Sequence, residues 1–318
     1  MRISIALCTY NGGRFLAEQL ASIGAQTRPP DELVVCDDAS ADDTVAIARA
    51  FAARAPFRVR VEVNPTNLRS TANFARAIGL CTGDVIALSD QDDVWLPHKL
   101  DTLARALAAA PDAGFAFTNA AVVDDRLVPL GYTLWDAIRF GRAEQERFRR
   151  GGAFAGLLRK YRVTGATMAF RTAYRDLILP IPCDWVHDAW IALVIAAVAP
   201  CVPVAVCLIR YRQHPAQQLG EAKRGLYGQY RVARTMTRAT YEAVAARYAD
   251  ALSRLQSVPG VAPEHLGKLA GKVNHFRRRT AMREPGAWRL PLVWGEIRRG
   301  NYRRFSLGWK AVAQDLLL

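Results

Sequence analysis

The sequence predicts an α/β fold in which helices flank a mostly parallel sheet, followed by a basic helical region at the C-terminal end. Two observations predict it. In the first hundred residues, short apolar runs alternate with segments of helical periodicity, and polar turns separate them. This alternation is typical of strand–helix units that build a parallel sheet. From about residue 219 onward, the pattern is helical and rich in arginine.

The first half of the chain predicts four strands and four helices. The strands are expected where apolar or alternating residues run up to a polar turn, at 3–8, 32–36, 57–63 and 84–89. The helices are expected between these strands and after the last one, at 15–23, up to 53 after the capping groups of 40–43, at 71–80 and at 97–109. Pro97 suits the first turn of the last helix.

Beyond residue 110 the rhythm changes. We expect strands at 115–123 and 163–170, a helix at 188–199, and an irregular, arginine-rich segment at 131–162. Residues 189–209 form an apolar run that is long enough to span a membrane. Because Pro200 and Pro203 interrupt this run, we expect a buried helix, a turn and a buried strand instead.

The distribution of charge and the spacing of the cysteines limit the partners and the location that the sequence predicts. Residues 219–318 hold 19 Lys and Arg against 7 Asp and Glu, whereas residues 1–218 hold 24 against 22. The basic region therefore predicts an anionic partner. The six cysteines lack zinc-site spacing, and no signal peptide is recognisable, so we expect a reduced, cytoplasmic location.

Three polar turns end the strands of the predicted sheet, at Thr9–Gly13, Asp37–Ser40 and Asp90–Asp93. In such sheets, ligands bind outside the carboxyl ends of the strands. The third turn packs three carboxylates into four residues, and a Mg²⁺ or Mn²⁺ ion that also binds phosphate oxygens would neutralise them. A solvated acidic turn that caps the next helix explains this segment, taken alone, equally well. The acidic pair of the second turn fits either an N-cap or a contact with a base or ribose.

Three segments resemble the motifs of family 2 glycosyltransferases with the GT-A fold, in order and in separation. They are Cys8–Gly12, Cys36–Thr44 and Ser89–Pro97. The resemblance covers about residues 1–215 and implies a mixed, mostly parallel sheet. It also implies inverting, metal-dependent transfer from a nucleoside-diphosphate sugar. The forms of the motifs resemble rhamnosyl-type and related bacterial transferases of surface polysaccharides.

The same resemblance assigns roles to individual residues. Donor binding is expected from Thr9, Tyr10, Asn11, Asp38, Asn67, Arg69, Asp90, Gln91, Asp92, Thr164, Gly165 and Arg212. Mn²⁺ or Mg²⁺ is expected at Asp92, Asp90 and His214. Asp188 is the expected general base, and Asp184 is a weaker candidate. Without the upstream motifs, an acid that stabilises a helix N-terminus would be the better explanation of Asp188. The residues after His214 depart from related sequences, where Asn commonly follows.

The resemblance also implies a division of the chain. We expect a catalytic domain at 1–218, in which 1–110 binds the nucleotide sugar and 111–218 supplies the acceptor side and the base. Residues 219–318 form the basic region, where arginine clusters alternate with aromatic residues. This mixture suits peripheral contact with an anionic membrane at the inner face of the plasma membrane, where a lipid-linked glycan acceptor would lie. A solvated helical face would explain the same arginine and aromatic residues equally well.

Other functions compete with this interpretation. A nucleotidyltransferase also places carboxylates and metal at strand ends, but the glycine-rich basic loop that it would need is only faintly present at residues 11–14. A non-catalytic protein that binds nucleotide sugars or anions is the other alternative. Nucleic-acid binding is not expected, because no helix-turn-helix, zinc or RNA-binding motif is recognisable.

Overall fold

The computed structural model describes residues 1–214, 236–284 and 288–317. The chain divides into two compact units. The first comprises Met1–Gly151 and Val163–Glu221, and the second comprises Gly152–Arg162 and Ala222–Leu318. The expected α/β fold is confirmed in the first unit.

A nine-stranded sheet forms the centre of the first unit, in the order β3-β2-β1-β4-β8-β6-β9-β5, with β7 paired to β6. Its parallel half comprises β1 (Ile3–Thr9), β2 (Glu32–Asp37), β3 (Arg58–Val63) and β4 (Val85–Ser89). Every residue of β1, β2 and β4 is buried, as expected for parallel strands covered on both faces. These four strands end at the three polar turns and at Asn64.

The other half of the sheet makes it mixed. Its strands are β5 (Val94–Trp95), β6 (Phe115–Val123), β7 (Pro129–Thr133), β8 (Met168–Arg171) and β9 (Cys201–Arg212). Strand β8 is antiparallel to both of its neighbours, β4 and β6, whereas β6 and β9 are parallel. The segment 115–123 is a strand as expected. The apolar run 189–209 becomes a buried helix, a turn and strand β9, as expected, but β9 is only partly buried, with Val206 50% exposed.

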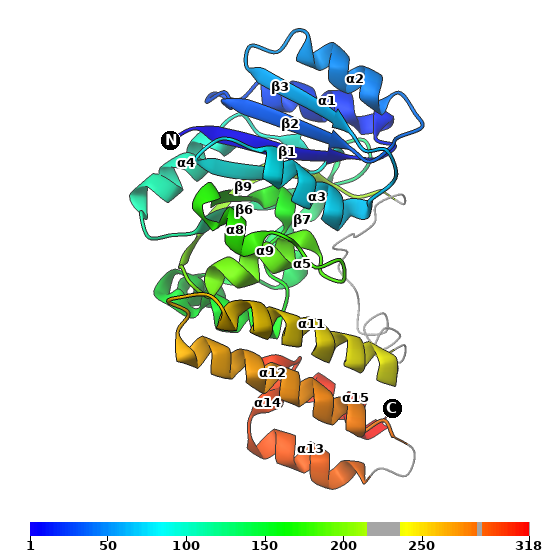
Figure 1. Cartoon of the computed structure of the whole chain (residues 1–318), viewed down its shortest axis with the longest axis vertical. Helices are drawn as coiled ribbons and strands as arrows, with labels where there is room; N and C mark the ends of the chain where they lie inside the picture. The colour runs from blue at the N-terminus through cyan, green and yellow to red at the C-terminus, as the bar shows by residue number, and fades with distance from the viewer. Residues whose placement is uncertain (215–235, 285–287, 318) are drawn as a thin grey trace. The chain divides into compact units, whose positions relative to one another are not determined.

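Helices surround these strands (Figure 1). They are α1 (Gly13–Gly24), α2 (Thr44–Ala52), α3 (Arg69–Leu80), α4 (Lys99–Ala109), α5 (Leu134–Ile138), α6 (Arg142–Arg147), α8 (Arg175–Ile178) and α9 (His187–Ala196). Each of α1 to α4 follows a strand and buries one apolar stripe; α1 buries Phe15, Leu16, Leu20 and Ile23. Helix α9 is buried almost all round, which explains why its sequence resembles a membrane span.

Two expectations about the middle of the chain are wrong. Residues 131–162 are not irregular: they contain α5, α6, a π-helical turn at Phe148–Gly152 and α7 (Ala153–Arg159). A capping box at Thr133 and Asp136 starts α5, a signal that the sequence contained. Residues 163–170 are not one strand either, because a 3₁₀ turn at Gly165–Thr167 precedes β8.

The second unit is helical where the structure describes it. It contains α7, α11 (Arg238–Gln256), α12 (Pro263–Ala281), α13 (Arg289–Arg298), α14 (Asn301–Phe305) and α15 (Trp309–Leu317). Helices α11 and α12 pack side by side (Figure 1). A helical region is confirmed for residues 238–284 and 289–317. The expected helix before residue 236 lies outside the described residues.

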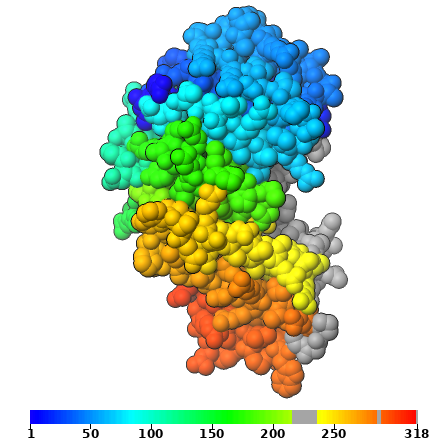
Figure 2. Space-filling view, viewed as in Figure 1, coloured from blue at the N-terminus to red at the C-terminus, as the bar shows by residue number. Residues whose placement is uncertain are grey.

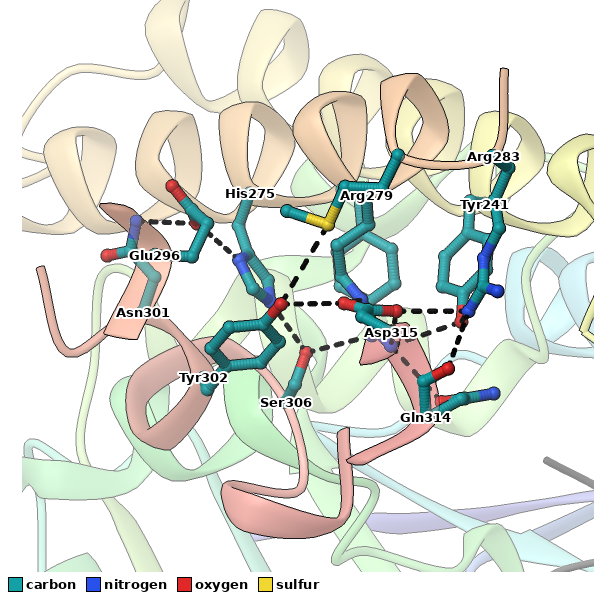
Figure 3. Close-up of polar contacts among 12 residues, drawn as sticks. Tyr241, His275, Arg279, Arg283, Glu296, Asn301, Tyr302, Ser306, Gln314 and Asp315 are labelled. Carbon is teal, nitrogen blue, oxygen red and sulfur yellow. Dashed lines mark hydrogen bonds and ion pairs between the residues drawn. The ribbon is translucent and has the colours of Figure 1, made fainter. Parts of the chain in front are cut away.

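Buried ion pairs hold α12 to α13 and α15 (Figure 3). Arg279 of α12 donates two hydrogen bonds to Asp315 of α15, at 2.7 and 2.9 Å. His275 of α12 lies 2.5 Å from a carboxylate oxygen of Glu296 in α13. Both carboxylates have no exposed side-chain surface, so each charge depends on its partners. Hydrogen bonds and nearby cations outweigh burial and lower the pKa of Glu296 to about 2.

Candidate active site

Hydrogen bonds join the three polar turns into one surface at the carboxyl ends of the strands. The side chain of Asn11, in the first turn, accepts a hydrogen bond of 2.9 Å from the backbone of Ala41 in the second. The side-chain amide of Gln91, in the third turn, pairs with the backbone of Tyr10 at 2.8 and 3.0 Å. A Cβ at Gly12 would lie only 2.1 Å from the side-chain amide of Gln91, so a larger residue here would displace that amide from Tyr10.

The backbone of this surface is strained at three places. Asn11, Ala39 and Arg69 each adopt a positive φ, of 46°, 62° and 67°. Residues other than glycine rarely take this conformation, and it recurs at functional sites. Asn67 and Arg69 are both exposed, and the side chain of Asn67 accepts a hydrogen bond from the backbone of Arg69.

The two acidic residues of the second turn differ in what they bind. Asp37 accepts hydrogen bonds from Thr9, at 2.8 Å, and from the backbone and hydroxyl of Ser40, at 2.8 and 2.5 Å. Asp38 accepts from Asn64 and from the backbone of Leu68, both at 2.7 Å and both through Oδ1. Asp37 therefore stabilises the turn itself. Asp38 accepts its hydrogen bonds from Asn64 and Leu68 through Oδ1 and not through Oδ2. The expected donor residue Thr9 is buried beneath the turn, whereas Tyr10 is 43% exposed.

The third turn gathers acidic groups at the end of β4. Burial and the nearby carboxylates of Asp92 and Asp188 raise the pKa of Asp90 to about 7. Asp93 is fully buried: one of its oxygens accepts a hydrogen bond from the backbone of Arg212, and the other has no partner within the described part of the chain. Burial and its acidic neighbours raise the pKa of Asp93 well above its usual value. Carboxylates so close together favour a bound cation.

Asp92 and His214 meet at the edge of this cluster. Nε2 of His214 lies 2.9 Å from Oδ2 of Asp92, and both side chains are mostly buried. A carboxylate oxygen and an imidazole nitrogen together suit Mn²⁺, and the carboxylates alone suit Mg²⁺. No group of three or more His, Cys, Asp or Glu side chains among the described residues is arranged to hold a metal ion. A metal ion at Asp92 and His214 would therefore need further ligands from a bound molecule or from water.

Arg212 is engaged within the protein. Its guanidinium donates to the backbone oxygen of Asp92 at 2.7 Å, to that of Asp125 and to the carboxylate of Glu18, and it lies 4.4 Å from the ring centroid of Phe15. These contacts fix the backbone beside the acidic turn. The expectation that Arg212 binds phosphate directly stays a prediction, and the contacts point to a positioning role.

Asp188 lies at the start of α9 and is 4% exposed. The backbone N–H of Gly165 donates to its Oδ2 at 2.7 Å. A Cβ at Gly165 would lie 2.9 Å from His187 and 3.3 Å from Asp188, so the turn approaches this carboxylate closely. Asp184, the weaker candidate for the base, is exposed. Since Asp188 acts electrostatically on Asp90, the fold brings the expected base and the acidic turn into one site.

Two buried polar groups beside Asp188 lack a partner among the described residues. The hydroxyl of Thr164 is one, and the imidazole of His187, stacked 3.8 Å from Phe74 between ring centroids, is the other. Buried polar groups are nearly always hydrogen-bonded in folded proteins, so these two are candidates for contact with a polar ligand. The sequence predicted Thr164 as a site residue but did not predict His187. The only signal for His187 was its place next to Asp188.

A scan against models of known families decides the class of this protein. The model described as glycosyl transferase family 2 matches residues 4–177, which is more than half of the chain. The chain belongs to glycosyltransferase family 2. The resemblance seen in its three motifs is confirmed.

Relatives and solved structures agree with membership of family 2. EpsE of Bacillus subtilis, which is named as a glycosyltransferase, is 39% identical over 100 residues, or 31% of this chain and 36% of that protein. An uncharacterized glycosyltransferase of Nostoc is 31% identical over 114 residues, or 36% of this chain and 35% of that protein. The chain thus matches about a third of the length of each of these relatives.

Among solved structures, a fragment of S. aureus TarS in complex with UDP-GlcNAc aligns with a TM-score of 0.62 at 15% identity, over 87% of this chain and 72% of that chain. The mannosyltransferase PcManGT of Pyrobaculum calidifontis, in complex with GDP-Man and Mn²⁺, aligns with a TM-score of 0.56 at 16% identity, over 99% and 84%. These likenesses confirm the GT-A type of fold. They leave the donor and acceptor of this family 2 member to be determined.

Proposed function

We propose that this family 2 member transfers a sugar from a nucleoside diphosphate to an acceptor hydroxyl with inversion, using Asp188 as general base. The observation that carries the proposal is the buried carboxylate of Asp188, which accepts a 2.7 Å hydrogen bond from the backbone of Gly165. The next residue of that turn, Ala166, is hydrogen-bonded to Lys99 from the helix that follows the acidic turn. A single displacement needs the base on the acceptor side and charge stabilisation on the diphosphate side, and this site supplies both.

Different residues of the first unit would bind the donor and act on the acceptor. Tyr10, Asp38 and the 67–69 turn would bind the base and ribose, because they surround the ends of β1 and β2. Asp188 would accept the proton of the acceptor hydroxyl while its oxygen attacks the anomeric carbon. The hydrogen bond from Gly165 holds the carboxylate in place for this step. The buried hydroxyl of Thr164 and the imidazole of His187 would meet polar groups of the sugars.

Asp92, His214 and Asp90 would hold Mn²⁺ or Mg²⁺. When bound, such an ion supplies Lewis-acid stabilisation of the departing diphosphate. Two observations support the fit: the oxygen and nitrogen of Asp92 and His214 lie 2.9 Å apart, and burial together with the nearby carboxylates of Asp92 and Asp188 raises the pKa of Asp90. Arg212 would keep the acidic turn in place through the backbone of Asp92.

The finer parts of the proposal concern substrates and location. We propose that residues 1–218 form the catalytic domain, with 1–110 on the donor side and 111–218 on the acceptor side, and that 219–318 serve the acceptor or its surroundings. The donor proposed from the motif forms is dTDP-rhamnose, and the acceptor is a cell-surface polysaccharide or a lipid-linked glycan. The location proposed is the cytoplasm, with peripheral contact at the inner face of the plasma membrane. No described helix is long and apolar enough to cross a membrane.

A thermal-shift panel tests donor binding first. The full chain is measured with UDP, dTDP, GDP and CDP, each with and without Mn²⁺ or Mg²⁺, since a ligand of the native state raises the melting temperature. We expect one diphosphate to stabilise the protein only with metal, and Asp92→Ala to abolish the effect. A folded sample that responds to none of the nucleotides would favour the non-catalytic alternative.

A matched pair of variants tests the base. With the nucleotide sugar that the panel identifies, Asp188→Asn should lower kcat on the order of a thousandfold while nucleotide binding persists. Asp184→Asn, four residues away and exposed, should behave like the wild type. Equal losses in both variants, or none in Asp188→Asn, would remove Asp188 from the mechanism.

A further inference from the structure

Three tryptophans in the second unit are exposed to solvent. Trp288 is 84% exposed, Trp309 73% and Trp294 62%, and Leu290 and Leu307 beside them are 72% and 55% exposed. The core of the same helices is made of other residues, namely Met282, Val293, Tyr302, Ala311 and Val312. A folded protein normally keeps its largest apolar side chains inside, so a set of exposed ones marks an interaction surface.

These side chains follow the outer stripes of two helices. On α13, Leu290, Trp294 and Arg298 recur every fourth residue and are all exposed, while Val293 and Glu296 face the core. On α15, Trp309 and Leu316 are exposed, while Ala311 and Val312 face the same core. Because α13 and α15 pack on each other, their outer stripes belong to one folded element, drawn in orange to red in Figure 2.

The charge exposed by this element has one sign. Within residues 288–317, the only acidic residues are Glu296 and Asp315, and neither has any exposed side-chain surface. The exposed charged residues of the segment are all basic: Arg298, Arg299, Arg303, Arg304 and Lys310. The buried ion pairs with α12 thus remove both negative charges from the outside.

We propose that the outer surface of residues 288–317, here called the Trp-Arg surface, docks on the headgroup layer of an anionic phospholipid bilayer. Tryptophan favours the boundary between apolar and aqueous layers, and arginine is attracted to anionic headgroups. A helix that carries both on its outer stripe lies in the interface plane and does not cross the bilayer. This inference rests on the second unit alone, so it stands or falls apart from the proposed transfer reaction.

Vesicle binding by the full chain tests the proposal. The vesicles contain phosphatidylcholine alone or a mixture with phosphatidylglycerol, and both sedimentation and tryptophan emission are measured. The chain has seven tryptophans, and the four outside this surface, Trp95, Trp135, Trp185 and Trp190, are at most 5% exposed. A shift of emission to shorter wavelength on adding vesicles therefore reports on the Trp-Arg surface. We expect binding and the shift with the anionic vesicles, weakened by salt.

Variants separate this surface from general stickiness. The triple variant W288S/W294S/W309S should lose the emission shift and most of the binding. R303Q/R304Q, which leaves every tryptophan in place, should weaken binding about fivefold per cation removed. The control Val206→Ser changes an exposed apolar residue of the first unit and should bind like the wild type.

The folding of each variant is checked by thermal unfolding, and R303Q/R304Q keeps the test valid even when the triple variant does not fold. Three results would overturn the proposal: a folded wild type that ignores anionic vesicles, vesicle binding that both variants retain in full, and a preference for an anionic oligonucleotide over the vesicles.

Discussion

The ammonium group of Lys99 donates a hydrogen bond of 2.7 Å to the backbone oxygen of Ala166. Lys99 is fully buried, and its nitrogen lies 3.2 Å from the ring centroid of Trp95. Ala166 follows Gly165, whose N–H holds the carboxylate of Asp188. Helix α4 is thereby tied to the turn that positions the proposed base. Burial lowers the pKa of Lys99 well below its usual value, and the carboxylates of Asp93 and Asp90 act in the opposite direction.

Lys99→Met tests this link. The variant keeps the length of the side chain but leaves the oxygen of Ala166 without its donor, which should cost about 1–3 kcal/mol of unfolding free energy. Misplacement of the turn should also lower kcat roughly ten- to a hundredfold, with a smaller effect on KM. The pH profile should shift to higher pH, because Lys99 lowers the pKa of Asp90. Arg105→Met, on the exposed side of the same helix, is the control, and matching kinetics in the two variants would argue against a positioning role.

His214→Ala tests the metal ligands. Without its imidazole, the site keeps only carboxylates, so the affinity for Mn²⁺ in the presence of the nucleoside diphosphate should fall on the order of tenfold or more. Calorimetric titration of Mn²⁺ into the nucleotide complex measures the change. His98→Ala replaces an exposed histidine and should leave the titration unchanged. An unaltered titration for His214→Ala would exclude the histidine as a ligand.

Asp90 makes the stability of the metal-free protein depend on pH. Its pKa is about 7 in the folded state, above the ordinary value of 3.8, so the folded state binds the proton more tightly than the unfolded state. The favourable contribution of protonated Asp90 is present below pH 4 and is lost as the pH rises toward 7. Asp90→Asn should therefore reduce the loss of unfolding free energy between pH 5 and pH 8, measured by urea unfolding with a chelator. A loss as large as that of the wild type would contradict this assignment.

The second unit depends on Asp315. Arg279, Arg283 and Tyr302 all donate hydrogen bonds to its buried carboxylate. Asp315→Ala leaves buried cations without a counter-charge and should destabilise the fold by about 3–5 kcal/mol. Chemical unfolding of the full chain measures the loss, and Asp250→Ala, an exposed acid of α11, is the control. Equal stability of the two variants would show that the network contributes little.

Much of the fold and part of the site were predictable from the sequence. The four strands and four helices expected up to residue 109 occur within about two residues of the expected bounds, because periodic apolar patterns and polar turns specify them locally. The two-residue strand β5 was not expected, because it forms only by pairing with β9. The segment 131–162 was harder, since its short helices depend on packing and on one capping box. Lys99 and His187, which are buried, and Glu18, which is exposed, were missed as site residues, because each gains its role only from partners that are distant in the sequence.

The sequence by itself determined the family, the order of the strands and helices along the chain, and the acidic turns. Each of these depends on a short, continuous run of residues. Only the tertiary structure decided which side chains meet. It placed His214 against Asp92, 122 positions apart in the chain, and Lys99 against Ala166. Within residues 288–317 it also separated the two acids, Glu296 and Asp315, which are buried, from the tryptophans and most of the basic residues, which are exposed. Burial and charge pairing act through space, so no local pattern records them.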